Sequence, residues 1–306
     1  NYKKITYSVP GKVILSGEHS VVYGKPALVT AINLRLKFSL TILERSSQDG
    51  NSNKEIQFIS NKVKNYLKKE KINFVEKRFN FKIESEIPVG RGLGSSAALS
   101  VASVATFLEF YTGRQFEKEI INDLAFQIEK HFHKNPSGAD NSAACYGGLI
   151  LYQKQISLKN LNFKIPKNIG DKLFLIDSGQ PKETTGEMVD FVSNKIDESI
   201  LTEIEKTVNK LVISIQNGDA ILFKKSLINN EKLLEKIEVV SKKTKKLLVD
   251  LSRFGCGKIT GAGGYETNSG FLLFFAEDKE KLLKYLSTKK ILYYKFTSDN
   301  QGLKRI

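Results

Sequence analysis

The sequence has few residues of the kinds that build disulfide scaffolds and metal clusters. Its 306 residues include two cysteines, Cys145 and Cys256, which lie far apart and lack the close spacing of metal-binding pairs. We therefore exclude a disulfide-stabilised fold and expect the protein to work in the reducing cytoplasm. Of the three histidines, His131 and His133 could supply half of a metal site. Because no cysteine lies near them, we prefer to interpret them as a polar helix end.

Long apolar runs are also missing. No stretch of about 18 apolar residues occurs, so the sequence predicts no transmembrane helix and no membrane partner. The net charge is +15, from 48 basic and 33 acidic residues, and such an excess can indicate nucleic-acid binding. Here the lysines are scattered, without interleaved aromatic residues that could stack on bases, so we expect no nucleic-acid partner. A positive field would still attract an anionic nucleotide.

The P-loop signature of many nucleotide-binding proteins is absent, but another glycine-rich loop is present. No Gly-Lys pair is followed by Ser or Thr. Residues 88–98 instead read Pro-Val-Gly-Arg-Gly-Leu-Gly-Ser-Ser-Ala-Ala. Glycine lets backbone amides approach a ligand, and a helix that begins directly behind the loop presents unpaired N–H groups. The loop therefore suits a phosphate, with a structural turn as the alternative.

Strand and helix signals follow one another without regular alternation, which favours an α+β fold over a doubly wound sheet. The first ~40 residues are rich in β-branched residues and predict strands. After the glycine loop, residues 96–111 predict a buried apolar helix. Apolar residues at every fourth position predict a second helix over 116–131.

The character of the chain changes near residue 179, where long amphipathic helices begin. The first of these is predicted over 188–215 as a single helix. We place a domain boundary near residues 178–186. The sequence therefore predicts an N-terminal domain of residues 1–180 and a C-terminal domain of residues 181–306.

Three polar side chains outside the glycine loop could carry chemistry. Lys12 lies in a strand-like segment, and a compact cation there could steady a developing oxyanion. Asp140, in a predicted turn that contains Gly138, could accept a proton from a substrate hydroxyl. Glu129 borders the apolar stripe of its helix, where a carboxylate oxygen would suit Mg²⁺. Each has a plainer alternative: a surface lysine, a turn-capping aspartate and a solvated glutamate.

A second glycine cluster, Thr260 to Gly264, follows Lys258 and precedes an apolar strand. Glycines in this position allow close backbone approach, although a simple connector is the alternative. Taken in order, Pro10-Gly-Lys12, Pro88 to Ala98 and Thr260 to Gly264 resemble the three motifs of the GHMP kinases. The resemblance spans nearly the whole chain, and three motifs in the expected order make it specific.

Within this superfamily the sequence is most similar to the mevalonate kinases. Gly17 to Leu28, beginning Gly-Glu-His-Ser-Val-Val-Tyr, resembles their first motif. Pro136 to Asn141, followed by Tyr146-Gly-Gly148, resembles their catalytic segment. Galactokinases usually continue the Glu-His pair with Thr-Asp-Tyr, and phosphomevalonate kinases usually carry a Glu-Tyr type pair. Homoserine kinases generally lack the Asp140-Asn141 pair.

The resemblance implies ATP-dependent phosphorylation of the 5-hydroxyl of mevalonate. It also implies a ribosomal S5 domain 2-like N-terminal domain and a ferredoxin-like C-terminal domain, with the active site between them. Asp140 and Lys12 are implied as catalytic residues, and Ser96 and Glu129 as ligands of Mg²⁺. The residues implied in ATP binding are Gly90, Arg91, Gly92, Leu93, Gly94, Ser95 and Ser96. The residues implied in substrate binding are Glu18, His19 and Thr184, with Thr185 an equally good match for the last.

One segment departs from the family pattern. The third motif usually continues as a longer glycine run with a cysteine, whereas here a longer and more polar stretch, Tyr265 to Gly270, follows. We expect the reaction type to be kept, whereas nucleotide affinity and feedback inhibition by downstream isoprenoid diphosphates stay open. Other acceptors (phosphomevalonate, a sugar or homoserine) and a nucleotide-binding module without catalysis are the alternatives. The oligomeric state stays open, with a homodimer as one option.

Overall fold

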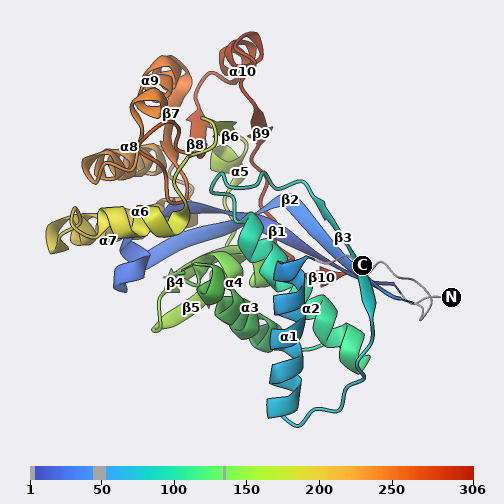
Figure 1. Cartoon of the computed structure of the whole chain (residues 1–306). Helices are drawn as coiled ribbons and strands as arrows, with labels where there is room; N and C mark the ends of the chain where they lie inside the picture. Colours follow the sequence, from blue (N-terminus) through green and yellow to red (C-terminus); the bar gives the residue numbers. More distant parts are fainter. Residues whose placement is uncertain (1–3, 44–52, 134–135) are drawn as a thin grey trace.

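The computed structural model describes residues 4–43, 53–133 and 136–306, which form two antiparallel sheets and the helices around them (Figure 1). The strands of the first sheet are β1 (Ile5–Ser16), β2 (Pro26–Ile42), β3 (Phe79–Ser85), β4 (Leu149–Gln153), β5 (Ser157–Asn160) and β10 (Lys304–Arg305). Their order is β10-β1-β2-β4-β5, and β3 pairs with the far part of the long strand β2. The last strand therefore returns to the sheet that the first strand began.

The second sheet has four strands with a different topology. They are β6 (Leu173–Asp177), β7 (Gly255–Ile259), β8 (Phe271–Ala276) and β9 (Tyr293–Lys295). Their order is β7-β8-β6-β9, and every pairing is antiparallel. Helices connect β6 to β7 and β8 to β9, which gives the β-α-β-β-α-β arrangement of ferredoxin-like folds. The α+β prediction is confirmed for this sheet and for the chain.

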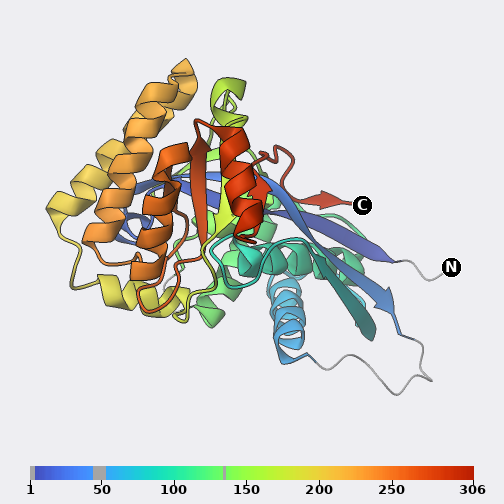
Figure 2. The same cartoon turned by 90° about the horizontal axis from the view of Figure 1, so that it is seen from above.

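Most helices accompany one of the two sheets. The helices are α1 (Lys54–Lys69), α2 (Ser95–Thr112), α3 (Lys118–Phe132), α4 (Ala139–Tyr146), α5 (Lys167–Gly170), α6 (Thr185–Val192), α7 (Glu198–Asn217), α8 (Ala220–Lys236), α9 (Lys242–Leu251) and α10 (Lys279–Thr288), with 3-10 turns at Ser20–Tyr23 and Ser252–Phe254. In Figure 1, α1 to α4 gather below the first sheet, while α8 to α10 accompany the second. Figure 2 shows α7 and α8 alongside one another. Of these two, α7 packs on β1 and β2 of the first sheet, whereas α8 contacts strands of both sheets. Within the described ranges, no helix has the length and apolar character needed to cross a membrane.

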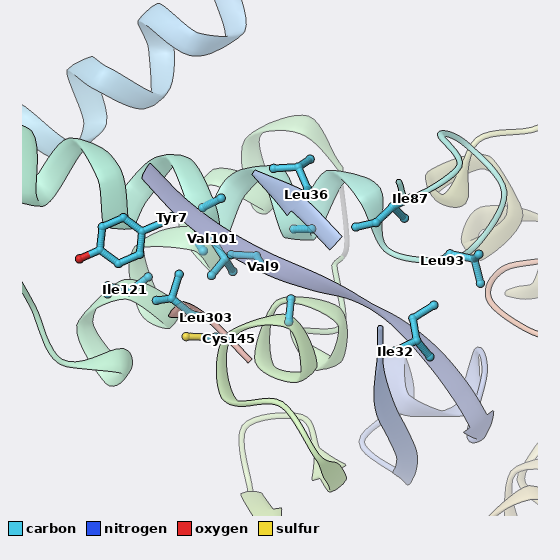
Figure 3. Packing of buried hydrophobic residues seen from close by; sticks show 14 of the residues in the cluster. Tyr7, Val9, Ile32, Leu36, Ile87, Leu93, Val101, Ile121, Cys145 and Leu303 are labelled. Carbon is cyan, nitrogen blue, oxygen red and sulfur yellow. The ribbon is translucent and has the colours of Figure 1, made fainter. Parts of the chain in front are cut away.

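The predicted apolar helix is α2, which is buried along almost its whole length. Small and apolar residues surround its axis, as expected of a helix in the centre of a domain. It packs on β1 and β2, and Figure 3 shows Val9 of β1 beside Val101 of α2. Leu93, in the glycine loop that precedes α2, belongs to the same core. The loop is therefore anchored by burial of apolar surface, which is the main stabilising force in folding.

Two local predictions are wrong. The single helix expected over 188–215 is divided into α6 and α7, because the side chain of Asp197 caps a new helix by accepting a hydrogen bond from Ile200 N. The turn expected around Asp140 is the first turn of α4. The domain division at residue 180 stays a prediction, since β6 already belongs to the second sheet and β10 returns to the first.

Candidate active site

A cavity of about 410 Å³ lies where β1 and the glycine loop meet the segments that follow β6 and β7. Its size suits a small ligand. The sequence-predicted residues that line it are Lys12, Glu18, His19, Gly90, Arg91, Gly92, Gly94, Ser95, Ser96, Glu129, Asp140 and Thr184. Leu93 differs from them, because its side chain is buried in the hydrophobic core.

Lys12 and Asp140 come from different elements and meet in this cavity. Lys12 lies in β1, which runs on through Pro10 and Gly11 with a shift in strand register. Gly94 leaves room for its side chain, since a Cβ at that position would lie 2.7 Å from Cγ of Lys12. Nζ of Lys12 lies 3.1 Å from Oδ2 of Asp140. The carboxylate thus lies beside a cation and at the N-terminal end of a helix, where negative charge is favourable.

The glycine loop ends directly at the N-terminus of α2. Gly94 precedes the helix with φ of 79° and offers no side-chain cap. The first N–H groups of the helix therefore lack the partners that a capping side chain would supply. Ser95 and Ser96 line the cavity at this point. With Lys12 alongside, the arrangement suits a phosphate group.

The two glycine clusters are in direct contact. A Cβ at Gly92 would lie 2.5 Å from the carbonyl oxygen of Thr260, and a Cβ at Gly261 would lie 2.9 Å from Cα of Gly92. The backbone of Phe271 also donates a hydrogen bond to the carbonyl of Arg91, at 3.1 Å. The third motif therefore packs directly against the glycine loop, because only glycine allows the two backbones to come so close.

Ser96 and Glu129 form a second polar group next to the loop. Oγ of Ser96 donates to Oε1 of Glu129 at 2.9 Å, and Oγ of Ser100 donates to the same oxygen at 2.7 Å. Burial raises the pKa of Glu129, although hydrogen bonds from both serines and the nearby His133 oppose the shift. A hydroxyl and a carboxylate are hard oxygen donors of the kind that Mg²⁺ prefers.

His133 is a site residue that the sequence interpretation missed. Its Nε2 lies 3.3 Å from Oγ of Ser96 and 3.7 Å from Oε2 of Glu129. His131, in contrast, faces away and stacks on Phe58 with ring centroids 3.8 Å apart. The available signal was the spacing, because His133 follows Glu129 by four residues and so shares its helix face.

His19 is held in one tautomer. Its Nε2 lies 2.9 Å from the carbonyl oxygen of Ala262, so this nitrogen must carry the proton and donate it. Nδ1 is then an acceptor, and it has no partner among the residues described. Burial lowers the pKa of His19 to about 4, which keeps the ring neutral. The cavity is therefore lined by a neutral imidazole whose buried Nδ1 has no partner among the residues described.

Glu18 is engaged in a buried ion pair with Lys258, a partner that the sequence interpretation did not assign. Nζ of Lys258 also donates to the carbonyl oxygens of Ile14, at 3.2 Å, and Ile259, at 2.7 Å. The amide of Asn230 approaches the other carboxylate oxygen of Glu18 at 3.5 Å. The pair therefore links β1 to β7 and α8 next to His19.

Thr184 and Arg91 also have internal partners. Thr184 is the N-cap of α6 and forms a capping box with Glu187. Thr185 lines the cavity as well, so both threonines stay candidates for substrate contact. Arg91 forms an ion pair with Asp177, the last residue of β6. Its guanidinium is thereby held at the C-terminal end of β6, an interior strand of the second sheet.

Known proteins resemble this chain in both sequence and structure. The sequence model of the GHMP kinases N terminal domain matches residues 59–148. Mevalonate kinase of Archaeoglobus fulgidus is 33% identical over 267 residues, which covers 84% of this chain and 88% of that protein. Mevalonate kinase of Thermococcus gammatolerans is 32% identical, with coverage of 85% and 87%. A crystal structure of mevalonate kinase from Methanococcus jannaschii superposes with a TM-score of 0.79 at 25% identity, covering 97% and 98% of the two chains.

Proposed function

The chain belongs to the mevalonate kinase family of the GHMP kinases, and we propose that it transfers the γ-phosphoryl group of ATP to the 5-hydroxyl of mevalonate. The products are 5-phosphomevalonate and ADP. Relatives at 32–33% identity that match most of their own length support this assignment. The phosphate-binding geometry in the cavity supports a phosphorylated nucleotide as the donor.

The pairing of Lys12 with Asp140, at 3.1 Å, is the observation that carries the mechanism. In the proposed reaction the 5-hydroxyl oxygen attacks the γ-phosphorus while the bond to the bridging oxygen of ADP breaks. Asp140 accepts the hydroxyl proton. Lys12 steadies negative charge on the attacking oxygen. Phosphoryl transfer depends mainly on such positioning and charge neutralisation.

The phosphates of ATP are placed at the N-terminus of α2. Backbone N–H groups of the loop and the first turn donate to the phosphate oxygens. Ser96 and Glu129 would hold Mg²⁺, which neutralises phosphate charge when bound. No group of three or more histidine, cysteine, aspartate or glutamate side chains is arranged to hold a metal ion in the part of the chain that the structure describes. The remaining ligands would therefore be phosphate oxygens and water, as is usual for this ion.

His19 is proposed to bind the acceptor. Its free Nδ1 accepts a hydrogen bond from a substrate hydroxyl, because the ring is neutral and Nε2 is held by Ala262. Glu18 acts indirectly, since its carboxylate is bound to Lys258. Thr184 or Thr185 completes this end of the cavity.

The cytoplasm is the proposed location. Cys145 and Cys256 are both free, which suits a reducing compartment. A homodimer stays a prediction, and sedimentation at several protein concentrations would test it.

The test is a coupled ADP-release assay with ATP and one acceptor at a time: mevalonate, phosphomevalonate, galactose and homoserine. Mevalonate should give the highest kcat/KM. Asp140→Asn should lower kcat by at least ~100-fold with little change in the KM for mevalonate, since general-base catalysis is of this order. Asp171→Asn, an exposed aspartate outside the cavity, is the control. Turnover of another acceptor but not of mevalonate would reject the proposal, and ATP binding without any turnover would favour an inactive module.

A further inference from the structure

The polar stretch that departs from the family pattern is attached to the acceptor side of the cavity. We name Tyr265 to Ser269 the polar loop and residues 180–186 the acceptor wall, since the latter line the cavity. We propose that the polar loop positions the acceptor wall for mevalonate, with Glu183 as the positioning residue that joins the two. The proposal rests on the function proposed above and names what sets acceptor affinity.

Glu183 forms the central connection. Its Oε1 accepts hydrogen bonds from two consecutive backbone N–H groups of the polar loop, those of Tyr265 at 3.1 Å and Glu266 at 2.8 Å. Hydrogen bonds to an ionised carboxylate are stronger than those between neutral groups. Because Glu183 directly precedes Thr184, the position of the polar loop sets the position of the candidate substrate residues.

Two further contacts fix the acceptor wall to the same loop. The amide of Asn268 donates to the carbonyl oxygen of Gln180 at 3.1 Å. The ring of Tyr265 stacks on Phe191 of α6, with centroids 4.3 Å apart. The wall is therefore held at its start, at its centre and through the helix that follows it. An aromatic pair of this kind stabilises the contact by more than the burial of its apolar area alone.

Two glycines make room for these contacts. A Cβ at Gly264 would lie 2.9 Å from Oε2 of Glu183, and a Cβ at Gly179 would lie 2.7 Å from Cγ of Asn268. The base of the loop is fixed by buried hydroxyls, since Ser269 Oγ donates to the carbonyl of Gly264 at 2.9 Å and accepts from Ser241 N at 2.9 Å. The polar loop is thus a firm support for the wall.

The glycine loop is held in place by other contacts. Gly92 and Arg91 contact Thr260, Gly261 and Gly270, which flank the polar loop. Within the polar loop, Ser269 lines the cavity and residues 265–268 do not, so those four residues act on a ligand through the acceptor wall and not by direct contact. Weakening the polar loop should therefore change the affinity for the acceptor and leave that for ATP unaltered.

The test measures KM for both substrates and kcat in Glu183→Ala, Glu183→Gln and Tyr265→Ala. We expect Glu183→Ala to raise the KM for mevalonate about 10-fold or more, as loss of hydrogen bonds to a charged group would. The KM for ATP should stay within about twofold. Glu183→Gln keeps an oxygen acceptor and should restore much of the affinity, while Tyr265→Ala should give a smaller rise. Glu203→Ala is the control, because it removes an exposed ion pair with Lys206 of the same helix, outside both the polar loop and the acceptor wall.

Some results would overturn the proposal. An unchanged KM for mevalonate in Glu183→Ala would do so, as would equal increases in both KM values. Tyr265→Ala keeps the test decisive if Glu183→Ala fails to fold, because Tyr265 is 40% exposed. Wild-type protein without mevalonate turnover would reject the proposed function itself. Active wild type with unaffected variants would reject only the role of the polar loop.

Discussion

Arg91 in the glycine loop forms an ion pair with Asp177 at the end of β6, so this loop is attached to both sheets. The aspartate side chain is 7% exposed and also accepts a hydrogen bond from Gly179 N at 2.9 Å. A buried carboxylate with two partners holds a loop more firmly than an exposed pair can.

Asp177→Asn should therefore raise the KM for ATP several-fold and leave the KM for mevalonate nearly unchanged. The variant keeps an acceptor for Gly179 but loses the charge that holds Arg91. Steady-state kinetics with each substrate varied in turn would measure this. Glu203→Ala, which removes an exposed ion pair with Lys206, is the control. An unaltered KM for ATP would mean that the core contacts of Leu93 suffice to place the loop.

Gly92→Ala should lower kcat/KM by displacing the glycine loop. The new Cβ would lie 2.5 Å from the carbonyl oxygen of Thr260, so the loop and the third motif would have to separate. Gly113→Ala is a matched control, because Gly113 also has a positive φ, of 76°, but no atom of the described residues lies within 4 Å of its Cβ position. In the control, backbone strain should lower the free energy of unfolding by only about 1 kcal/mol. Comparable kcat/KM losses in both variants would show that strain, and not the glycine contact, is responsible.

Ser96→Ala should raise the Mg²⁺ concentration needed for half-maximal activity by several-fold, and Glu129→Gln should do so more strongly. The reason is that each removes an oxygen donor from the cavity. Ser100→Ala is the control, since Ser100 also donates to Oε1 of Glu129 but does not line the cavity. Titrations of Mg²⁺ at fixed ATP measure the effect. Equal shifts in Ser96→Ala and Ser100→Ala would assign Ser96 to orienting Glu129 alone.

Glu231 should make stability depend on pH. Burial raises its pKa to about 7 from the usual 4.5, against the hydrogen bond from Ile259 N and the charge of Lys258. Between these values the folded state keeps a proton that the unfolded state releases, so rising pH destabilises the fold. The loss is at most roughly 1.4 kcal/mol per pH unit and ends above pH 7.

Glu231→Gln removes this titration. The difference between its free energy of unfolding and that of the wild type, measured by urea denaturation, should shift in favour of the variant from about pH 4.5 to 7, by up to roughly 3 kcal/mol. Below that window the difference should be constant, because the wild-type carboxyl is protonated in both states. Glu280→Gln, which removes an exposed carboxylate from α10, is the control, because its charge does not contribute to the pKa shift of Glu231. A difference that does not change with pH would show that Glu231 is ionised in the folded protein.

Local patterns in the sequence identify much of this fold and part of its site. The apolar residues of α2, the glycines before it and those after Lys258 are visible as short-range signals, because propensity and periodicity act over a few residues. The break between α6 and α7 was missed, since a single capping aspartate interrupts an otherwise continuous apolar pattern. The four-residue spacing of Glu129 and His133 also indicated that the two side chains lie on one helix face. The lack of a nearby cysteine instead led to the interpretation of His133 as part of a polar helix end.

The sequence by itself determined the family motifs, the α+β class and the candidate catalytic and binding residues, since each depends on neighbours along the chain. Only the tertiary structure decided which of these residues meet. The pairing of Glu18 with Lys258, the contact of Gly92 with Gly261 and the attachment of Glu183 to the polar loop join segments far apart in sequence. Such contacts form because burying apolar surface brings the two sheets together, and no local pattern encodes which polar groups then become partners.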